Sequence, residues 1–143
     1  MKKLLTILLC SASATFGLAQ QQTYFSNPVI HGDLADPSVM RIGETYYATG
    51  TSSEWAPYYP VFSSSDLVNW KPEGHVFDRK PDWTKSSFWA PEWYYHKGKV
   101  YVYYTARKES DNISCIGVAV ADSPTGEFKD YGPVVEFGKE AID

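Results

Sequence analysis

The sequence contains an internal repeat with a period of roughly 54 residues. Each copy opens with a hairpin that follows a proline: residues 40–47 follow Pro37, and residues 94–104 follow Pro91. A glycine-containing turn divides each hairpin, and the flanking residues are tyrosines and β-branched residues, as is typical of β-strands. The two copies are therefore predicted to form the same structural unit.

The second half of each copy is also shared. An apolar strand ends in Asp-Leu or Asp-Ser, at residues 61–67 and 116–123, and an aromatic residue then precedes a glycine-containing turn, at Trp70 and Phe128. This pattern predicts four strands per unit, and such a unit at this period is typical of a β-propeller blade. Two unrelated hairpin pairs in a sandwich are the alternative, and the matched Pro, Gly, Tyr-Tyr and Asp positions disfavour it.

Aromatic residues make up 16% of the chain, with 11 Tyr, 7 Phe and 5 Trp, which is more than one small core can hold. Blades pack their faces against neighbouring blades, so a propeller accounts for this excess. Propellers need at least four blades, and two units cannot close a ring. We therefore expect an all-β chain that covers about the first two blades and the start of a third, as the N-terminal piece of a longer protein.

Alignment of the repeat units shows which residues occupy the equivalent position at the start of each unit. Asp36 occupies this position in the first unit, Ala90 in the second and Asp143, one period later, in the third. The first strand of each blade lines the central axis of a propeller, so Asp36 and Asp143 are predicted to face one pocket, with Ala90 between them. The simpler alternative for Asp36 is a turn residue, because Asp-Pro is a frequent turn dipeptide.

The N-terminus has the features of a secretory signal peptide. A pair of lysines precedes an apolar run, and small residues up to Ala19 form a cleavage motif. We expect removal of residues 1–19 and a mature chain of residues 20–143 that is secreted or periplasmic. The alternatives are a buried N-terminal helix and a lipid anchor at Cys10.

Charge and hydropathy argue against nucleic acid and the membrane interior as partners of the mature chain. The formal net charge is -4, and no basic stripe for nucleic acid is present. No apolar run outside the N-terminus approaches the ~18 residues of a membrane span. His31, His75 and His96 share no metal-ligand spacing, so no metal site is assigned.

Six short motifs follow one another through residues 27–143. They are Asn-Pro-Val-Ile at 27–30, Ala-Asp-Pro at 35–37, Tyr-Tyr at 46–47, Ser-Ser-Asp-Leu-Val-Asn-Trp at 64–70, Trp-Ala-Pro-Glu at 89–92, and an Ile-Gly-Val-Ala strand with an Asp-Ser-Pro turn between 116 and 124. In this order and spacing they resemble glycoside hydrolase family 43 over nearly all of the mature chain.

The resemblance implies a five-bladed β-propeller catalytic domain that hydrolyses arabinose- or xylose-containing plant polysaccharides or oligosaccharides with inversion. It implies that Asp36 is the general base and that Asp143 tunes the pKa of the general acid and orients it. The general acid itself is a Glu beyond this chain, so the activity of the 143 residues alone stays open. The alternative is a non-catalytic carbohydrate-binding propeller fragment.

Three further residues are candidates for substrate binding. Trp89 and Trp55 offer rings that can stack on a sugar, and Glu92 can accept a hydrogen bond from a sugar hydroxyl. Packing between blades is the alternative for Trp89, and a solvated turn for Glu92. The resemblance implies no required cofactor. Some relatives carry an ion in the central channel, and the residues that would hold it are not in this chain.

Overall fold

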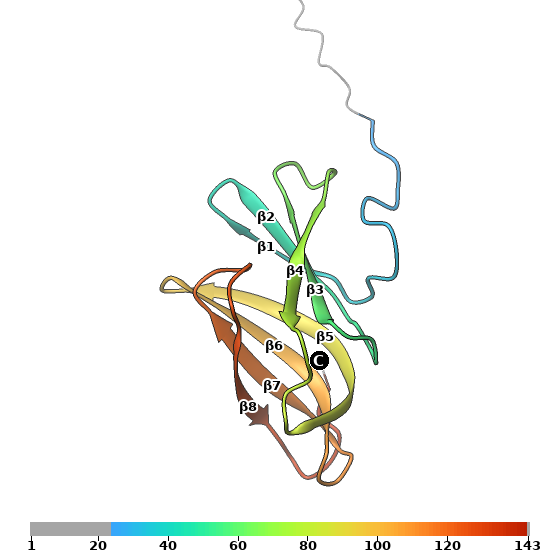
Figure 1. Ribbon diagram of the computed structural model, residues 1–143, viewed down its shortest axis with the longest axis vertical. Helices are drawn as coiled ribbons and strands as arrows, with labels where there is room; N and C mark the ends of the chain where they lie inside the picture. Colours follow the sequence, from blue (N-terminus) through green and yellow to red (C-terminus); the bar gives the residue numbers. More distant parts are fainter. Residues whose placement is uncertain (1–23, 143) are drawn as a thin grey trace, which may run out of the picture.

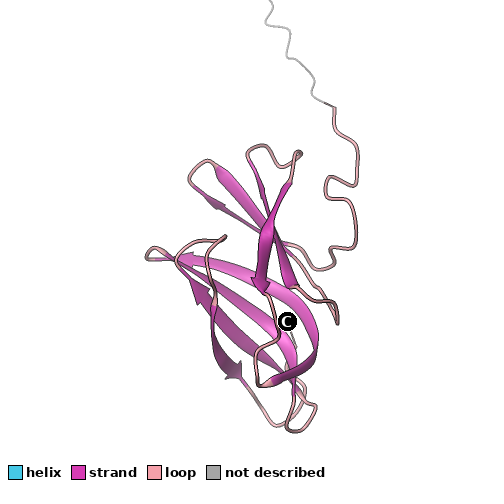
Figure 2. Cartoon of the chain, viewed as in Figure 1, coloured by secondary structure: helices cyan, strands magenta, loops and turns pink. Residues whose placement is uncertain are grey.

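The computed structural model describes residues 24–142, and every regular element in this part of the chain is a β-strand (Figures 1 and 2). Eight antiparallel strands form two four-stranded meanders, in the orders β1-β2-β3-β4 and β5-β6-β7-β8. The strands are β1 (Ser38–Ile42), β2 (Thr45–Thr49), β3 (Tyr58–Ser64), β4 (Lys71–Phe77), β5 (Thr84–His96), β6 (Lys99–Lys108), β7 (Ser114–Ala121) and β8 (Lys129–Val135). The described residues include no helix that could span a membrane.

Each sheet corresponds to one copy of the repeat, so the prediction of four strands per unit is confirmed. The β1–β2 and β5–β6 hairpins turn at Gly43 and Gly98, whose φ angles are 60° and 78°. Glycine carries no Cβ penalty in this left-handed region. Trp70 directly precedes β4, and Phe128 directly precedes β8. The glycine-containing turns predicted after these two aromatic residues are wrong, because Gly74 and Gly132 lie within the paired strands β4 and β8.

The strand β5 begins earlier than the sequence predicts. The hairpin was expected to start after Pro91, whereas β5 starts at Thr84 and its first half pairs with β6 as far as Lys108. The pairing of β5 with β6 shifts register three times between Thr84 and Glu92. Pro91 lacks a backbone N–H, and it lies at one of these irregularities, where a strand can include a proline without losing a ladder bond.

The hydrophobic core lies between the two sheets. Tyr59 of β3 is fully buried, and its ring centroid lies 6.2 Å from Phe77, 6.0 Å from Phe88 and 5.5 Å from Tyr104. Its hydroxyl donates to the backbone carbonyl of Thr105 at 2.9 Å, so this buried phenol is satisfied. Burial raises the pKa of Tyr59 well above its ordinary value. The inter-sheet packing expected for the aromatic residues is thus present between these two units.

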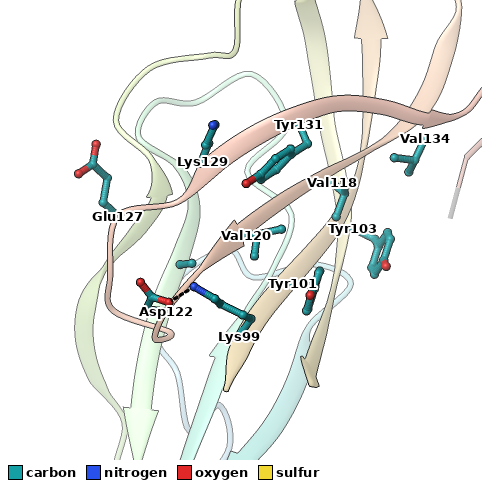
Figure 3. A pocket seen from close by; sticks show the side chains of 11 residues that line it. Lys99, Tyr101, Tyr103, Val118, Val120, Asp122, Glu127, Lys129, Tyr131 and Val134 are labelled. Carbon is teal, nitrogen blue, oxygen red and sulfur yellow. Dashed lines mark hydrogen bonds and ion pairs between the residues drawn. The ribbon is translucent and has the colours of Figure 1, made fainter. Parts of the chain in front are cut away.

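The outer face of each sheet carries an apolar hollow. On the second sheet a hollow of about 700 Å³ lies among side chains that include Tyr101, Tyr131 and Val134 (Figure 3). On the first sheet a hollow of about 690 Å³ is lined by residues that include Val39 and Trp70. Both sheets therefore present apolar surface on the side away from the shared core.

Candidate active site

Asp36 lies two residues before the start of β1, and it lines a cavity of about 470 Å³. The cavity is lined by Asp36, Ala90, Pro91, Glu92, Tyr103, Tyr104 and Ile116. The first residues of the two repeat units, Asp36 and Ala90, thus share one cavity, as the repeat phase predicts. Asp36 is solvent-exposed.

Thr51, which follows β2, holds the Asp36 carboxylate. Its hydroxyl donates to Oδ2 of Asp36 at 2.7 Å and accepts the backbone N–H of Ala90 at 2.8 Å. Its own backbone N–H donates to the carbonyl of Ala35 at 2.9 Å. Thr51 is not among the residues predicted for the site, because no local motif marks a threonine at the end of a strand.

Gly50 permits this arrangement. A Cβ at Gly50 would lie 2.6 Å from Cδ1 of Leu34 and 2.9 Å from the carbonyl oxygen of Ala35. Only a residue without a side chain lets the segment before Asp36 pass so close to the end of β2. The site therefore depends on glycine at this position.

The loop after Thr51 is fastened to β5. The backbone N–H groups of Ser52 and Ser53 donate to the carbonyl of Phe88 at 3.2 and 3.1 Å, and the N–H of Phe88 donates to the carbonyl of Ser53 at 3.0 Å. A carboxylate oxygen of Glu54 accepts the N–H of Ser87 at 2.8 Å. These bonds join the loop after β2 to the strand β5, whose residues 90–92 line the cavity.

The three predicted sugar-binding residues lie in different places. Glu92 is exposed on the cavity wall, in the same cavity as Asp36. Trp89 is half-buried, does not line this cavity, and has the guanidinium of Arg107 6.0 Å from its ring centroid. Trp55 is 77% exposed, in the loop after β2. The structure thus brings Glu92, but not the two tryptophans, to the cavity of Asp36.

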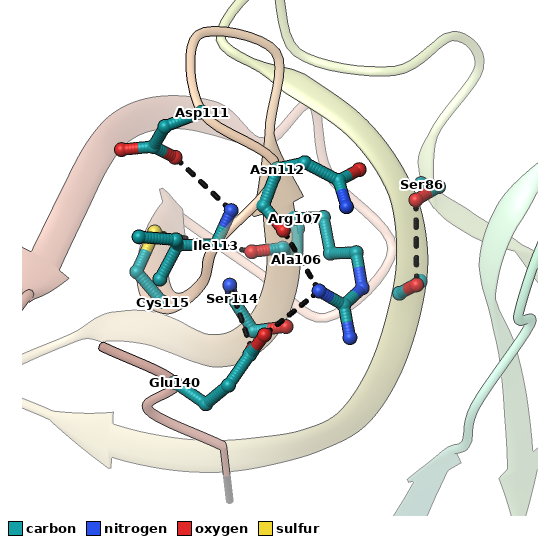
Figure 4. A network of polar contacts seen from close by, with 10 residues as sticks. Ser86, Ala106, Arg107, Asp111, Asn112, Ile113, Ser114, Cys115 and Glu140 are labelled. Atoms are coloured by element: carbon teal, nitrogen blue, oxygen red, sulfur yellow. Dashed lines mark hydrogen bonds and ion pairs between the residues drawn. The ribbon is translucent and has the colours of Figure 1, made fainter. Parts of the chain in front are cut away.

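Asp143 and the predicted signal peptide, residues 1–19, lie outside the described residues. The segment just before Asp143 is attached to the start of β7 (Figure 4). Glu140 pairs with Arg107 at 2.8 Å and accepts the backbone N–H of Ser114 at 3.0 Å, while the N–H of Ala141 donates to the Ser114 carbonyl at 3.0 Å. Hydrogen bonds from Ser114, together with Arg107, hold the pKa of Glu140 below its ordinary value.

The chemistry available at the cavity is that of carboxylates. Among residues 24–142, no group of three or more His, Cys, Asp and Glu side chains could hold a metal ion. A carboxylate held by a hydroxyl donor can take a proton from a water molecule.

Comparison with known proteins identifies the family of the chain. The family model described as glycosyl hydrolases family 43 matches residues 25–143. An extracellular exo-alpha-(1->5)-L-arabinofuranosidase from Cellvibrio japonicus is 35% identical over 116 residues, covering 73% of this chain and 32% of that protein.

Two solved structures superpose on the fold. A thermostable family-43 glycoside hydrolase matches with a TM-score of 0.74 and 32% identity, over 84% of this chain and 39% of that one. A beta-xylosidase/alpha-arabinofuranosidase from a compost microbial metagenome, in complex with xylotriose, matches with a TM-score of 0.70 and 28% identity, over 85% of this chain and 41% of that one. The chain spans about a third of the length of the relatives it matches. From the family match and these similarities we conclude that the chain belongs to glycosyl hydrolases family 43.

Proposed function

We propose that these residues form the N-terminal part of a secreted, five-bladed β-propeller glycosidase. It hydrolyses arabinose- or xylose-containing plant polysaccharides or oligosaccharides with inversion of the anomeric configuration. The observation that carries the proposal is the Asp36 carboxylate, which lies on a cavity and is held there by the hydroxyl of Thr51. The names of the relatives, which include arabinofuranosidase and beta-xylosidase, support this substrate class.

In this proposal Asp36 is the general base. Within residues 24–142, Oδ1 of Asp36 receives no hydrogen bond, and Thr51 occupies Oδ2. Oδ1 can therefore accept a proton from the attacking water, which lies on the face of the sugar opposite the leaving group. No cofactor is needed, because the base and a carboxylic acid together move the two protons of the reaction.

Asp143 is proposed to tune the general acid, a Glu that follows it in the full-length protein. A carboxylate beside this Glu raises the pKa of the Glu by like-charge repulsion and keeps it protonated near neutral pH. Asp143→Asn should therefore move the alkaline limb of the pH–rate profile toward lower pH. Substrates with good leaving groups need little protonation, so they should be affected less by this change than by Asp36→Asn.

Substrate contacts are proposed at the cavity and around it. Glu92 accepts a hydrogen bond from a sugar hydroxyl beside the base. Trp55, with its exposed ring in the loop after β2, stacks on a more distant sugar unit of a longer chain. Trp89, whose ring centroid lies 6.0 Å from the Arg107 guanidinium, is proposed to stack on a further sugar unit. The apolar hollows on both outer sheet faces support further blades on either side of these two.

The test uses the product of the natural gene, expressed with its leader. The protein in the medium or periplasm is assayed on para-nitrophenyl α-L-arabinofuranoside, para-nitrophenyl β-D-xyloside, arabinan and xylan. Proton NMR of the first product identifies its anomer, and the proposal expects the inverted one. Retention of the leader in a cytoplasmic product would contradict the secretion proposal.

Asp36→Asn tests the role of the base. General-base catalysis contributes about 10²- to 10⁴-fold, so kcat should fall by at least 10²-fold while the melting temperature changes little. Asp33→Asn is the matched control, because Asp33 is an exposed aspartate three residues away that does not line the cavity. Binding of oligosaccharide without hydrolysis by the wild-type protein would favour the alternative, a non-catalytic carbohydrate-binding propeller.

A further inference from the structure

We infer that Thr51 is a positioning residue for the base Asp36, and that it sets the carboxylate by linking it to the second sheet. This inference rests on the proposed function of Asp36. It is carried by three contacts of one residue, to Ala35, Asp36 and Ala90, of which Asp36 and Ala90 line the cavity.

The direction of the hydroxyl proton is determined by its neighbours. The N–H of Ala90 can only donate, so the Thr51 oxygen accepts there. The single hydroxyl proton is then free to point at Oδ2 of Asp36, 2.7 Å away. An ionised carboxylate only accepts hydrogen bonds, so this arrangement suits the charged form that a base requires.

Thr51 also holds the backbone that carries the base. Asp36 has a φ of 47°, in the left-handed region that a non-glycine residue with a following proline rarely adopts. Such a conformation persists where the surroundings over-determine it. The N–H of Thr51 bonds the carbonyl of Ala35, and its hydroxyl bonds the Asp36 side chain, so a single residue restrains both.

The link to Ala90 makes the position of the base depend on β5. Ala90 belongs to the Trp-Ala-Pro-Glu segment, whose Glu92 lines the same cavity. A shift of this segment would move the Ala90 N–H, then Thr51, then Oδ2 of Asp36. The position of the base Asp36 and that of the proposed sugar contact Glu92 therefore both depend on the strand β5.

The experiment compares Thr51→Val, Thr51→Ala and Thr51→Ser in the natural gene product, with the two para-nitrophenyl glycosides as substrates. Loss of one hydrogen bond to a charged group predicts a fall in kcat of about 10- to 100-fold for Val and Ala. Because the base acts in the transition state, KM should change by less than about threefold. Thr51→Ser keeps the hydroxyl and should restore kcat to within about threefold of wild type.

The control is Thr125→Val, at an exposed threonine in the turn between β7 and β8, which should leave both constants unchanged. A double mutant separates positioning from general stability. In an Asp36→Asn background, Thr51→Val should lower kcat by less than about threefold, because the group it orients is already lost.

The outcomes distinguish the two claims. If Asp36→Asn retains activity, the proposed function fails. If Asp36→Asn loses activity but Thr51→Val retains it, only the Thr51 inference is overturned. The inference is also overturned if the two changes are additive, if Thr51→Ser is as impaired as Thr51→Val, or if neither Thr51→Val nor Thr51→Ala folds.

Discussion

Asp36 and Ala90 occupy the same position in successive repeats and share one unusual backbone conformation, with φ angles of 47° and 41°. Both precede a proline, and both line the same cavity. Non-glycine residues adopt positive φ in only a few per cent of cases, and such strain gathers at functional sites. The repeat therefore carries a strained turn in each unit, and in the first unit this turn presents the proposed base.

The strain at Ala90 can be tested by substitution. Ala90→Val is expected to lower the free energy of unfolding by about 1–2 kcal/mol, because a β-branched residue fits the left-handed region poorly. Ala90→Gly should change it by less than about 1 kcal/mol, since relief of strain and the added entropy of the unfolded chain oppose each other. Urea denaturation measures both, and a Val variant as stable as wild type would contradict the strain.

The buried hydroxyl of Tyr104 should be required for stability. It donates to Oδ1 of Asp130 at 2.6 Å, and the indole N–H of Trp83 donates to Oδ2 at 2.9 Å. Burial, and then the hydrogen bond to Asp130, raise the pKa of Tyr104 far above its ordinary value, so it remains a donor. Tyr104→Phe removes one partner of this carboxylate and should cost about 1–3 kcal/mol.

Tyr103→Phe is the matched control for this change. Tyr103 is the preceding residue on β6, and it is exposed while Tyr104 is fully buried. Its substitution should alter stability by no more than about 0.5 kcal/mol in thermal unfolding. Equal effects at the two tyrosines would show that the Asp130 contact contributes nothing.

The turn from Ser64 to Trp70 should lose stability in acid through Asp66. The backbone N–H of Asn69, then its side-chain amide, then the N–H of Val68 and the Ser64 hydroxyl hold the pKa of Asp66 well below its ordinary value. A lowered folded-state pKa stabilises the fold above the unfolded-state pKa of ~3.9, and this stabilisation is lost as the pH falls through the folded-state value.

Asp66→Asn should therefore lower the melting temperature at pH 7, and the difference from wild type should shrink as the pH falls below ~4. Asp82→Asn, at an exposed aspartate outside this turn, is the control and should have a small effect at both pH values. A difference between wild type and Asp66→Asn that is independent of pH would mean that the charge of Asp66 is irrelevant.

Glu140 should hold the segment that leads to Asp143. Glu140→Ala removes the acceptor for Arg107 and for the Ser114 N–H, so the adjacent hydrogen bond from the Ala141 N–H should open more often. Hydrogen exchange at the Ala141 amide is expected to accelerate about two- to fivefold, as for loss of one exposed ion pair. Glu127→Ala, at an exposed glutamate between β7 and β8, should leave this rate unchanged.

Much of the fold follows from local sequence patterns and can be predicted from them. The glycines at 43 and 98, each flanked by β-branched and aromatic residues, predicted both hairpins. The start of β5 at Thr84 was not predictable. Its first half is a strand only because β6 pairs with it through three shifts of register, and pairing with a distant strand leaves no mark in the local pattern.

The candidate site also has a part that the sequence predicts and a part that only the tertiary structure shows. By itself the sequence determined that Asp36 and Ala90 occupy equivalent places, because repeat phase is a property of the chain alone. Only the tertiary structure decided what holds Asp36, because Thr51 reaches it across 15 residues and reaches Ala90 across 39. The bond to Asp36 forms only after β1 and β2 have paired, through a close approach that Gly50 permits, and the bond to Ala90 forms only after the two sheets have packed. A threonine hydroxyl carries no signal in a sequence until its partners are brought beside it.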